Sequence, residues 1–131
     1  MDPIQNPVTN QNKILIVEDD FFIRDLYEMQ AKKEGYIVVT AADGEEAVAK
    51  AKSELPNLVL VDLMLPKVDG LSVIKTLKAD PTLSKIPCVI ITNLEDFAKE
   101  QEARQAGAVG YMLKIKNTPQ QVIENLKKYL Q

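Results

Sequence analysis

Short apolar runs of strand length alternate along this chain with segments whose apolar residues recur at helical spacing. The apolar runs predict five strands, at residues 14–17, 37–40, 58–61, 86–91 and 109–113. The helical spacing predicts helices that include residues 22–31, 47–55, 73–77, 94–106 and 119–130. Strands that alternate with helices predict an α/β fold, in which a doubly wound parallel sheet carries helices on both faces in three αβα layers.

Polar and charged residues follow four of the predicted strands at the points where the strands end. They are, in chain order, Glu18, Asp19, Asp20, Asp62, Thr92, Asn93 and Lys114. Ligands of such folds bind outside the carboxyl ends of the strands, so we expect carboxylates, a hydroxyl and an ammonium group to meet there. An acid at a strand end can also be a plain helix cap, and Asp20, next to the first predicted helix, fits that role best.

The expected cluster has a definite chemistry. Carboxylates held together repel each other and raise one another's pKa. A divalent cation relieves this repulsion, and Mg²⁺ is the hard ion that carboxylates, waters and phosphate oxygens hold together. A carboxylate in such a setting can be a nucleophile towards phosphorus. The metal and Lys114 would offset the charge of the transferring phosphoryl group.

The composition narrows the possible functions. The 131-residue chain contains no histidine, which removes Ser–His and Cys–His catalysis and imidazole metal ligands. Its formal net charge of −3 argues against nucleic-acid binding, which favours a basic face. Cys88 lies beside an apolar run and is predicted to be a buried core thiol. The polar residues 1–12 predict a flexible tail and residues 13–131 a single domain, and with no membrane segment in the sequence we expect a cytoplasmic protein.

The chain resembles the receiver domains of bacterial two-component response regulators from about Lys13 to the C-terminus. The resemblance rests on residues 14–20 (ILIVEDD), 62–70 (DLMLPKVDG), 90–92 (IIT) and 107–114 (GAVGYMLK), and the spacing between these stretches also fits the family. It implies a flavodoxin-like (βα)5 fold with the strand order 2-1-3-4-5. It further implies a stand-alone receiver of the chemotaxis type.

The resemblance also implies roles for the residues at the strand ends. Asp62 would accept a phosphoryl group from a phosphohistidine of a partner, either a sensor histidine kinase or a histidine phosphotransfer protein. Asp19 would bind Mg²⁺ directly, and Glu18 mainly through water. The backbone carbonyl of Met64 would be the third protein ligand of the ion, together with Asp62 itself. Arg24, where the family often has arginine, supports taking Glu18 and Asp19 as the acidic pair.

The same resemblance predicts how a signal would leave the site. Lys114 would pair with Asp62 and then with the phosphoryl group, to which Thr92 would donate its hydroxyl. Tyr111 would turn inward as an aromatic switch, although it could also be a plain half-buried strand residue. An unknown downstream protein would bind the face formed by the helix over 94–106, the strand over 109–113 and the last helix. The helix over 94–106 has a thin apolar stripe and could shift, and the protein would be a monomer or a phosphorylation-dependent dimer.

The chain departs from the family pattern around the site. Ile115 stands where the family usually has proline, and we expect a trans bond before it or a strained cis bond, since a non-proline cis bond costs about 3–4 kcal/mol. Asn93 is larger than the small residue that the family prefers there. Met64 and Leu94 stand where family members tune the attack of water, and neither can position a water molecule. We therefore expect a phosphoacceptor that catalyses only its own phosphorylation and slow self-dephosphorylation.

Other interpretations of the sequence are open at this point. A phosphatase of the haloacid dehalogenase type would use an aspartyl phosphate, but it has Asp-x-Asp at the end of its first strand, whereas Asp62 ends the third strand and is followed two residues later by Met64. A receiver-like module could bind partners without phosphate, although the full set of strand-end residues argues against this. The chain could also be a receiver excised from a larger regulator or a hybrid kinase.

Overall fold

The structure is a computed structural model that describes residues 12–130, and it contains a five-stranded parallel sheet in the order β2-β1-β3-β4-β5. The strands are β1 (Lys13–Val17), β2 (Ile37–Ala41), β3 (Leu58–Asp62), β4 (Cys88–Thr92) and β5 (Gly110–Leu113). The helices are α1 (Phe21–Lys33), α2 (Gly44–Glu54), α3 (Gly70–Ala79), α4 (Phe97–Ala106) and α5 (Pro119–Asn125), with short 3-10 helices at η1 (Lys114–Lys116) and η2 (Leu126–Tyr129). The predicted fold and strand order are confirmed.

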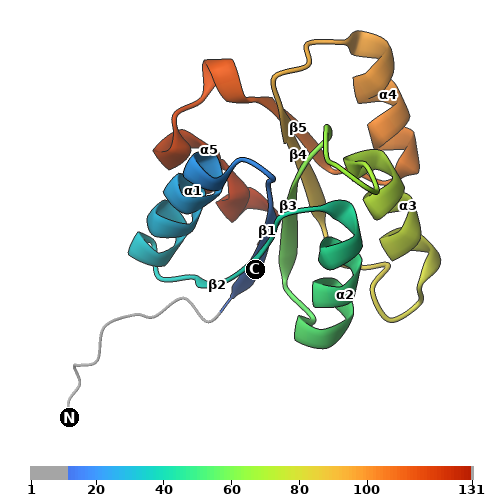
Figure 1. Cartoon of the computed structure of the whole chain (residues 1–131), viewed down its shortest axis with the longest axis horizontal. Coiled ribbons are helices and arrows are strands. Elements are labelled where there is room, and N and C mark those ends of the chain that lie inside the picture. The colour runs from blue at the N-terminus through green and yellow to red at the C-terminus, as the bar shows by residue number, and fades with distance from the viewer. Residues whose placement is uncertain (1–11, 131) are drawn as a thin grey trace.

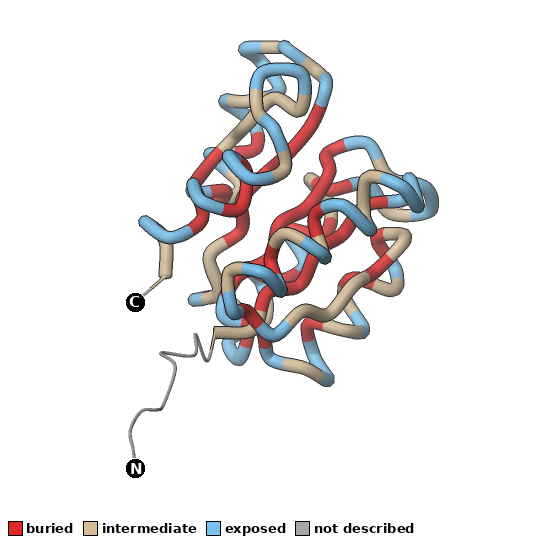
Figure 2. Tube along the Cα trace, turned by 90° about the vertical axis from the view of Figure 1, so that its left-hand side faces the viewer, coloured by how far each residue is buried: buried red, intermediate tan, exposed pale blue. Residues whose placement is uncertain are grey.

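Helices cover both faces of the sheet, because successive side chains of a strand point to opposite sides. In β3, Val59 and Val61 pack with α2, α3 and α4 on one face. Leu58 and Leu60 pack with α1 and α5 on the other (Figure 1). The central strands are buried along their length, as Figure 2 shows for the trace through the middle of the molecule. This double burial explains why these strands are apolar between their ends instead of alternating with polar residues.

The order in which successive strands are added to the sheet reverses between β1 and β3. β1 pairs with β2 on one side and with β3 on the other, and all four strand pairs are parallel. The connections from β1 and β3 therefore run to opposite faces of the sheet, and a crevice opens between them at the carboxyl ends of the strands. The fold places the residues after Val17 and the end of β3 at this crevice.

The predicted elements differ from the observed ones mainly at their ends. α4 begins at Phe97 and not at Leu94, because the side chain of Asp96 accepts a hydrogen bond from the Lys99 backbone N–H and caps the helix there. β4 begins at Cys88, after Pro87, which has no N–H to give to a sheet. The last helix is regular only to Asn125 and then tightens into a 3-10 turn.

The ends of the chain limit two further predictions. Residues 1–11 of the predicted tail and Gln131 lie outside the described residues. Asn12, assigned to the tail, accepts a hydrogen bond from the Ile37 backbone N–H at 3.0 Å and so lies beside the sheet. Between residues 12 and 130, no helix is long and apolar enough to cross a membrane.

Candidate functional site

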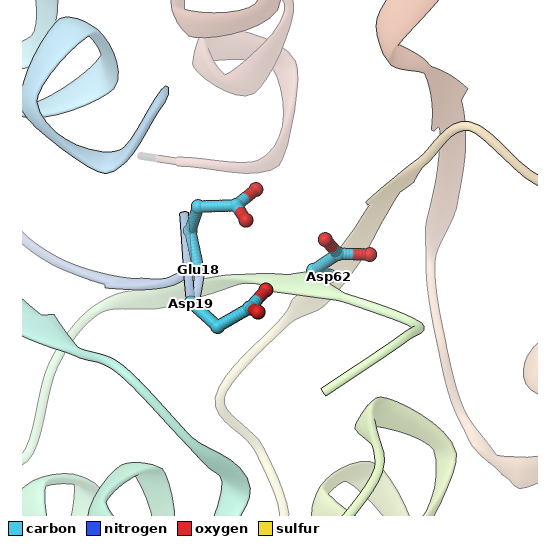
Figure 3. Close-up of side chains that lie close together, drawn as sticks. All are labelled: Glu18, Asp19 and Asp62. Carbon is cyan, nitrogen blue, oxygen red and sulfur yellow. The ribbon is translucent and has the colours of Figure 1, made fainter. Parts of the chain in front are cut away.

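Three carboxylates from two neighbouring strands converge at the crevice. Glu18 and Asp19 directly follow β1, and Asp62 is the last residue of β3. One carboxylate oxygen of each lies within 4.8 Å of those of the other two, and Figure 3 shows the side chains pointing towards a common space. Glu18 and Asp62 are buried, whereas Asp19 is exposed to solvent. The predicted carboxylate cluster therefore exists, and it is open on the side of Asp19.

Lys114 provides the positive charge at this cluster. Its Nζ lies 2.7 Å from Oδ2 of Asp62 and 2.6 Å from Oε1 of Glu18. Burial disfavours the charged ammonium, but the hydrogen bonds to Asp62 and Glu18 outweigh this cost and raise the pKa of Lys114. Burial raises the pKa of Glu18, and the bond from Lys114 opposes that rise. Lys114 is thus a fixed cation shared between two buried acids.

Three hydrogen bonds within the chain hold Glu18 in place. Its backbone N–H donates to Ala41 in β2, and its Oε2 accepts from the Asp20 N–H, both at 3.0 Å. Its carbonyl oxygen accepts from Nη1 of Arg24 at 2.9 Å. By contrast, Asp19 makes no hydrogen bond or ion pair with any residue in the described range. Asp19 therefore has both carboxylate oxygens available to an external cation.

Asp62 is held by the loop that follows it. Its Oδ1 accepts a hydrogen bond from the Met64 backbone N–H at 3.0 Å, while its Oδ2 faces Lys114. Thr92, fully buried at the end of β4, accepts from the Leu94 backbone N–H at 3.2 Å. Glu18, Asp19, Asp62, Met64, Thr92 and Lys114 all line one open pocket of about 460 Å³.

Tyr111, the predicted switch residue, is not among the residues that line the carboxylate pocket. It is half-buried in β5, and its hydroxyl donates to the Leu94 carbonyl at 2.7 Å. Because the Leu94 N–H is bound by Thr92, the two hydrogen bonds join Tyr111 to the pocket through one residue. Burial raises the pKa of Tyr111, with a smaller contribution from the negative charges of Glu100 and Asp96.

The structure also shows Ile115 and Asn93, two positions at which the chain departs from the family pattern. No peptide bond between residues 12 and 130 is cis, so the bond before Ile115 is trans. Ile115 belongs to η1 and is 81% exposed. Asn93 is exposed and lines the mouth of the pocket.

Comparison with known proteins decides the family. Residues 14–127 match the model of the response regulator receiver domain. The chain belongs to this family. It is 43% identical over 105 residues to a probable transcriptional regulator ycf27 of Cyanophora paradoxa. The aligned residues cover 80% of this chain and 43% of that protein. It is 35% identical over 117 residues to the polar-differentiation response regulator DivK of Brucella anthropi, covering 89% and 94% of the two chains.

Solved structures agree with this result. The chemotaxis protein CheY4 of Vibrio cholerae superposes with a TM-score of 0.86 at 29% identity, covering 92% of this chain and 100% of that one. The chain spans only 40–43% of the length of three ycf27 relatives. The prediction of a two-component receiver domain is confirmed, and a receiver is a signalling domain. The match also favours a receiver over a phosphatase of the haloacid dehalogenase type.

The receiver's carboxylates fit a hard divalent cation. The three acids supply oxygen ligands within reach of one ion, and oxygen-only sets suit Mg²⁺. The free oxygens of exposed Asp19 face solvent, from which an ion would arrive with most of its waters. The donor set is therefore the right kind for the predicted ion.

Sequence reasoning did not find every group that shapes this receiver site. The sequence indicates Arg24 only as a residue that the family often has, yet its guanidinium binds the Glu18 carbonyl and so orients the turn that carries Asp19. The signal was present, because Arg24 lies one helical turn after Asp20, whose side chain caps α1 as predicted. The link from Tyr111 to Leu94 carried no sequence signal, since it joins residues far apart in the chain.

Proposed function

We propose that Asp62 accepts a phosphoryl group from a phosphohistidine of a partner protein. The observation that carries the proposal is the meeting of Asp62 with two further acids and Lys114 in one pocket. A carboxylate oxygen of Asp62 attacks phosphorus, an O–P bond forms, and the N–P bond to the donor imidazole breaks. The imidazole nitrogen keeps the bonding electron pair and takes a proton from solvent. This chain has no histidine, so the donor belongs to another molecule or another domain.

The residues around Asp62 hold the groups that this transfer needs. Asp19 and Asp62 would bind Mg²⁺ directly, with the Met64 carbonyl as a further ligand and Glu18 acting through water. When bound, the ion supplies positive charge that offsets the oxygens of the phosphoryl group. Lys114, already 2.7 Å from Asp62, turns its ammonium to the same oxygens, and Thr92 donates its hydroxyl to one of them.

The donor reaches the pocket along α1. Phe22, Leu26 and Met29 are 77%, 49% and 60% exposed, and their spacing places them on one side of the helix. Ile23, in the same first turn, lines the carboxylate pocket. We infer that this apolar stripe contacts the helices of the kinase or phosphotransfer protein. Replacing Phe22 by Ser should slow transfer from a phosphohistidine protein and leave labelling by acetyl phosphate unchanged, because acetyl phosphate is too small to cover α1.

The phosphorylated state passes its signal through Leu94. When Thr92 turns towards the phosphoryl group, its hydrogen bond to the Leu94 N–H weakens, and Tyr111 is bound to the carbonyl of the same residue. The face formed by α4, β5 and α5 then changes, and a downstream protein reads it. The chain loses its own phosphoryl group slowly, because the side chains of Met64 and Leu94 cannot hold an attacking water.

Incubation with Mg²⁺ and acetyl phosphate tests the proposal. The mass of the intact protein should rise by one phosphoryl group, and the gain should vanish in Asp62→Asn and when the metal is removed with a chelator. Asp69→Asn is the matched control, since Asp69 caps α3 and asparagine caps equally well. That control should be labelled like the parent. Labelling that persists in Asp62→Asn contradicts the proposal.

A further inference from the structure

A second pocket adjoins the carboxylate pocket, between the loop that follows β3 and the start of α4. Its volume is about 510 Å³. We call it the β3–α4 pocket. Asp19, Met64 and Leu94 line both pockets, so the two spaces meet at these residues. A molecule that reacts at Asp62 can therefore extend from the carboxylate pocket into the β3–α4 pocket.

The walls of the β3–α4 pocket are mainly apolar. The apolar residues that line it are Leu63, Met64, Leu65, Pro66, Leu71 and Leu94. Of these, Leu65, Leu71 and Leu94 are half-buried and pack against the hydrophobic core, so the core holds them in place before any ligand arrives. A largely pre-formed pocket with such walls suits a short alkyl chain better than a strongly hydrated group.

Among the described residues that line the β3–α4 pocket, Lys99 is the one cation. Its Nζ lies 3.6 Å from Oε1 of Glu102, and both side chains are about half exposed, so another anion can replace Glu102 at small cost. The two acids of the lining have other roles. Asp69 accepts from the Ser72 backbone N–H at 2.8 Å and caps α3, and Asp19 belongs to the carboxylate cluster. The α4 side of the pocket therefore offers a positive charge to a small anion.

We propose that the β3–α4 pocket binds the leaving group of an acyl phosphate whose acyl chain is longer than that of acetyl phosphate. The proposal rests on Asp62 being the phosphoacceptor, and it names a class of small-molecule donor for that residue. A carboxylate oxygen of Asp62 forms the new O–P bond, and the bond from phosphorus to the bridging oxygen of the donor breaks. The carboxylate leaves with the electron pair, so no proton is needed. It pairs with Lys99, and its alkyl chain packs on Leu65 and Leu71.

The length of the alkyl chain decides how much of the β3–α4 pocket a donor fills. Acetyl phosphate ends in one methyl group and leaves most of the pocket to water. Each further methylene that is fully buried there should raise the second-order rate constant about fourfold. The carboxylates that leave acetyl, propionyl and butyryl phosphate are almost equally basic, so the reaction at phosphorus hardly differs between them. A preference among the three donors therefore reports contact with the chain.

Labelling of the parent protein with Mg²⁺ and a series of donors tests the proposal. The donors are acetyl, propionyl and butyryl phosphate, with phosphoramidate as a donor whose leaving group, ammonia, has no chain. The rise in the mass of the intact protein gives each second-order rate constant, which should be about five- to tenfold larger for butyryl than for acetyl phosphate. Equal or falling rate constants along the acyl series overturn the proposal and leave Asp62 as the phosphoacceptor. Labelling that persists in Asp62→Asn, or no labelling by any donor, overturns both.

Variants locate the preference in the β3–α4 pocket. Leu71→Asn keeps the size of the side chain but makes the wall polar, and it should remove most of the preference for butyryl phosphate. Lys99→Gln should slow all three acyl phosphates about threefold. Lys75→Gln is the matched control, because it removes the same charge from an exposed position on α3 outside the pocket. Labelling by phosphoramidate should be unchanged in all three variants, which also shows that they are folded. A preference that survives Leu71→Asn, or equal effects of the two lysine variants, overturns the proposal.

A binding measurement checks the same contact without phosphoryl transfer. An analogue of butyryl phosphate in which a CH₂ group replaces the bridging oxygen cannot donate its phosphoryl group. In the presence of Mg²⁺ it should shift the NMR signals of the methyl groups of Leu65 and Leu71, which line only the β3–α4 pocket of the two. The matching analogue of acetyl phosphate should leave these signals nearly unchanged. Shifts confined to the carboxylate pocket with both analogues overturn the proposal.

Discussion

α3 and α4 lie side by side on the same face of the sheet, yet the sheet holds them very differently (Figure 1). α3 buries Gly70, Val73, Ile74 and Leu77. In α4, all of whose residues are described, Ala103 alone is buried. A buried leucine or valine contributes about 1.5–3 kcal/mol, so several such residues fix α3 while one alanine holds α4. Of these two neighbours, α4 is the helix that can move at low cost.

The lightly held helix is also the one that is tied to the pocket. Leu94, in the loop before α4, donates its N–H to the Thr92 hydroxyl oxygen, and its carbonyl oxygen accepts from the Tyr111 hydroxyl. Each such bond contributes about 0.5–1.5 kcal/mol, whereas a hydrogen bond to a charged group contributes about 1.5–3 kcal/mol. A hydrogen bond from Thr92 to a phosphoryl group therefore stabilises the protein at least as much as the loss of the bond to Leu94 destabilises it. Small contact energies at the pocket can shift α4 but cannot shift α3.

The largest effect should appear in α3. Leu77→Ala removes a fully buried side chain and should lower the free energy of unfolding by about 2–5 kcal/mol. Phe97→Ala, at the start of α4, removes a side chain that is 76% exposed and should cost less than about 0.5 kcal/mol. Urea denaturation of the two variants measures both values. Similar losses would contradict the claim that α4 is lightly held.

The next effect concerns the lifetime of the phosphoryl group. The parent protein should keep its phosphoryl group for much longer than seconds, because neither Met64 on the α3 side nor Leu94 on the α4 side can orient a water. Met64→Glu places a carboxylate at the pocket and should speed hydrolysis by about tenfold or more. Decay of the phosphorylated mass after removal of acetyl phosphate measures the rate. A lifetime of seconds in the parent would contradict the prediction.

Tyr111→Phe tests the link between the pocket and α4. Loss of the bond to the Leu94 carbonyl should cost about 1 kcal/mol of stability. In the parent, Mg²⁺ with beryllofluoride should shift NMR signals of α4 and of Tyr111 and leave those of α3 nearly unchanged. In the variant the α4 shifts should shrink, while signals of Asp62 still respond. Changes confined to the acidic pocket in the parent would rule out the coupling.

The smallest effect should be a dependence of stability on alkaline pH. Because the pKa of Lys114 is raised, the folded protein keeps a proton at a pH at which the unfolded chain releases it. The contribution of Lys114 to the free energy of unfolding is therefore full below the ordinary lysine pKa and is lost as the pH rises above it. Burial raises the pKa of Tyr27 to about 12, so Tyr27 adds a further loss of stability over the same alkaline pH range. The difference between the parent and Lys114→Met isolates Lys114.

Lys99→Met, at an exposed position on α4, is the control for this pH dependence. Thermal melts between neutral pH and pH 11 give the curves. The difference in melting temperature between the parent and Lys114→Met should fall as the pH rises. The difference between the parent and Lys99→Met should not change with pH. A flat first difference would show that Lys114 is not held by the two buried acids in solution.

Much of the fold and the pocket could be predicted from the sequence, because the deciding signals are local. The run that ends at Asp62 is apolar since β3 is buried on both faces, and the strand ends bring distant residues to one edge. The apolar pattern places the start of α4 too early, at Leu94, because it does not show that Asp96 caps the helix. The hydrogen bonds of Arg24 and Tyr111 depend on how the elements pack, and sequence spacing alone does not contain that information.

The central claim is that Asp62, and not a neighbouring acid, carries the phosphoryl group. Treatment of the acetyl phosphate-labelled protein with borohydride reduces an aspartyl phosphate to homoserine, which marks its position in the chain. Mass spectrometry of the peptides should find homoserine at position 62, in an amount that follows Mg²⁺ in the labelling step. Homoserine at position 19 or 69, or none in a protein whose mass has risen by one phosphoryl group, would contradict the account.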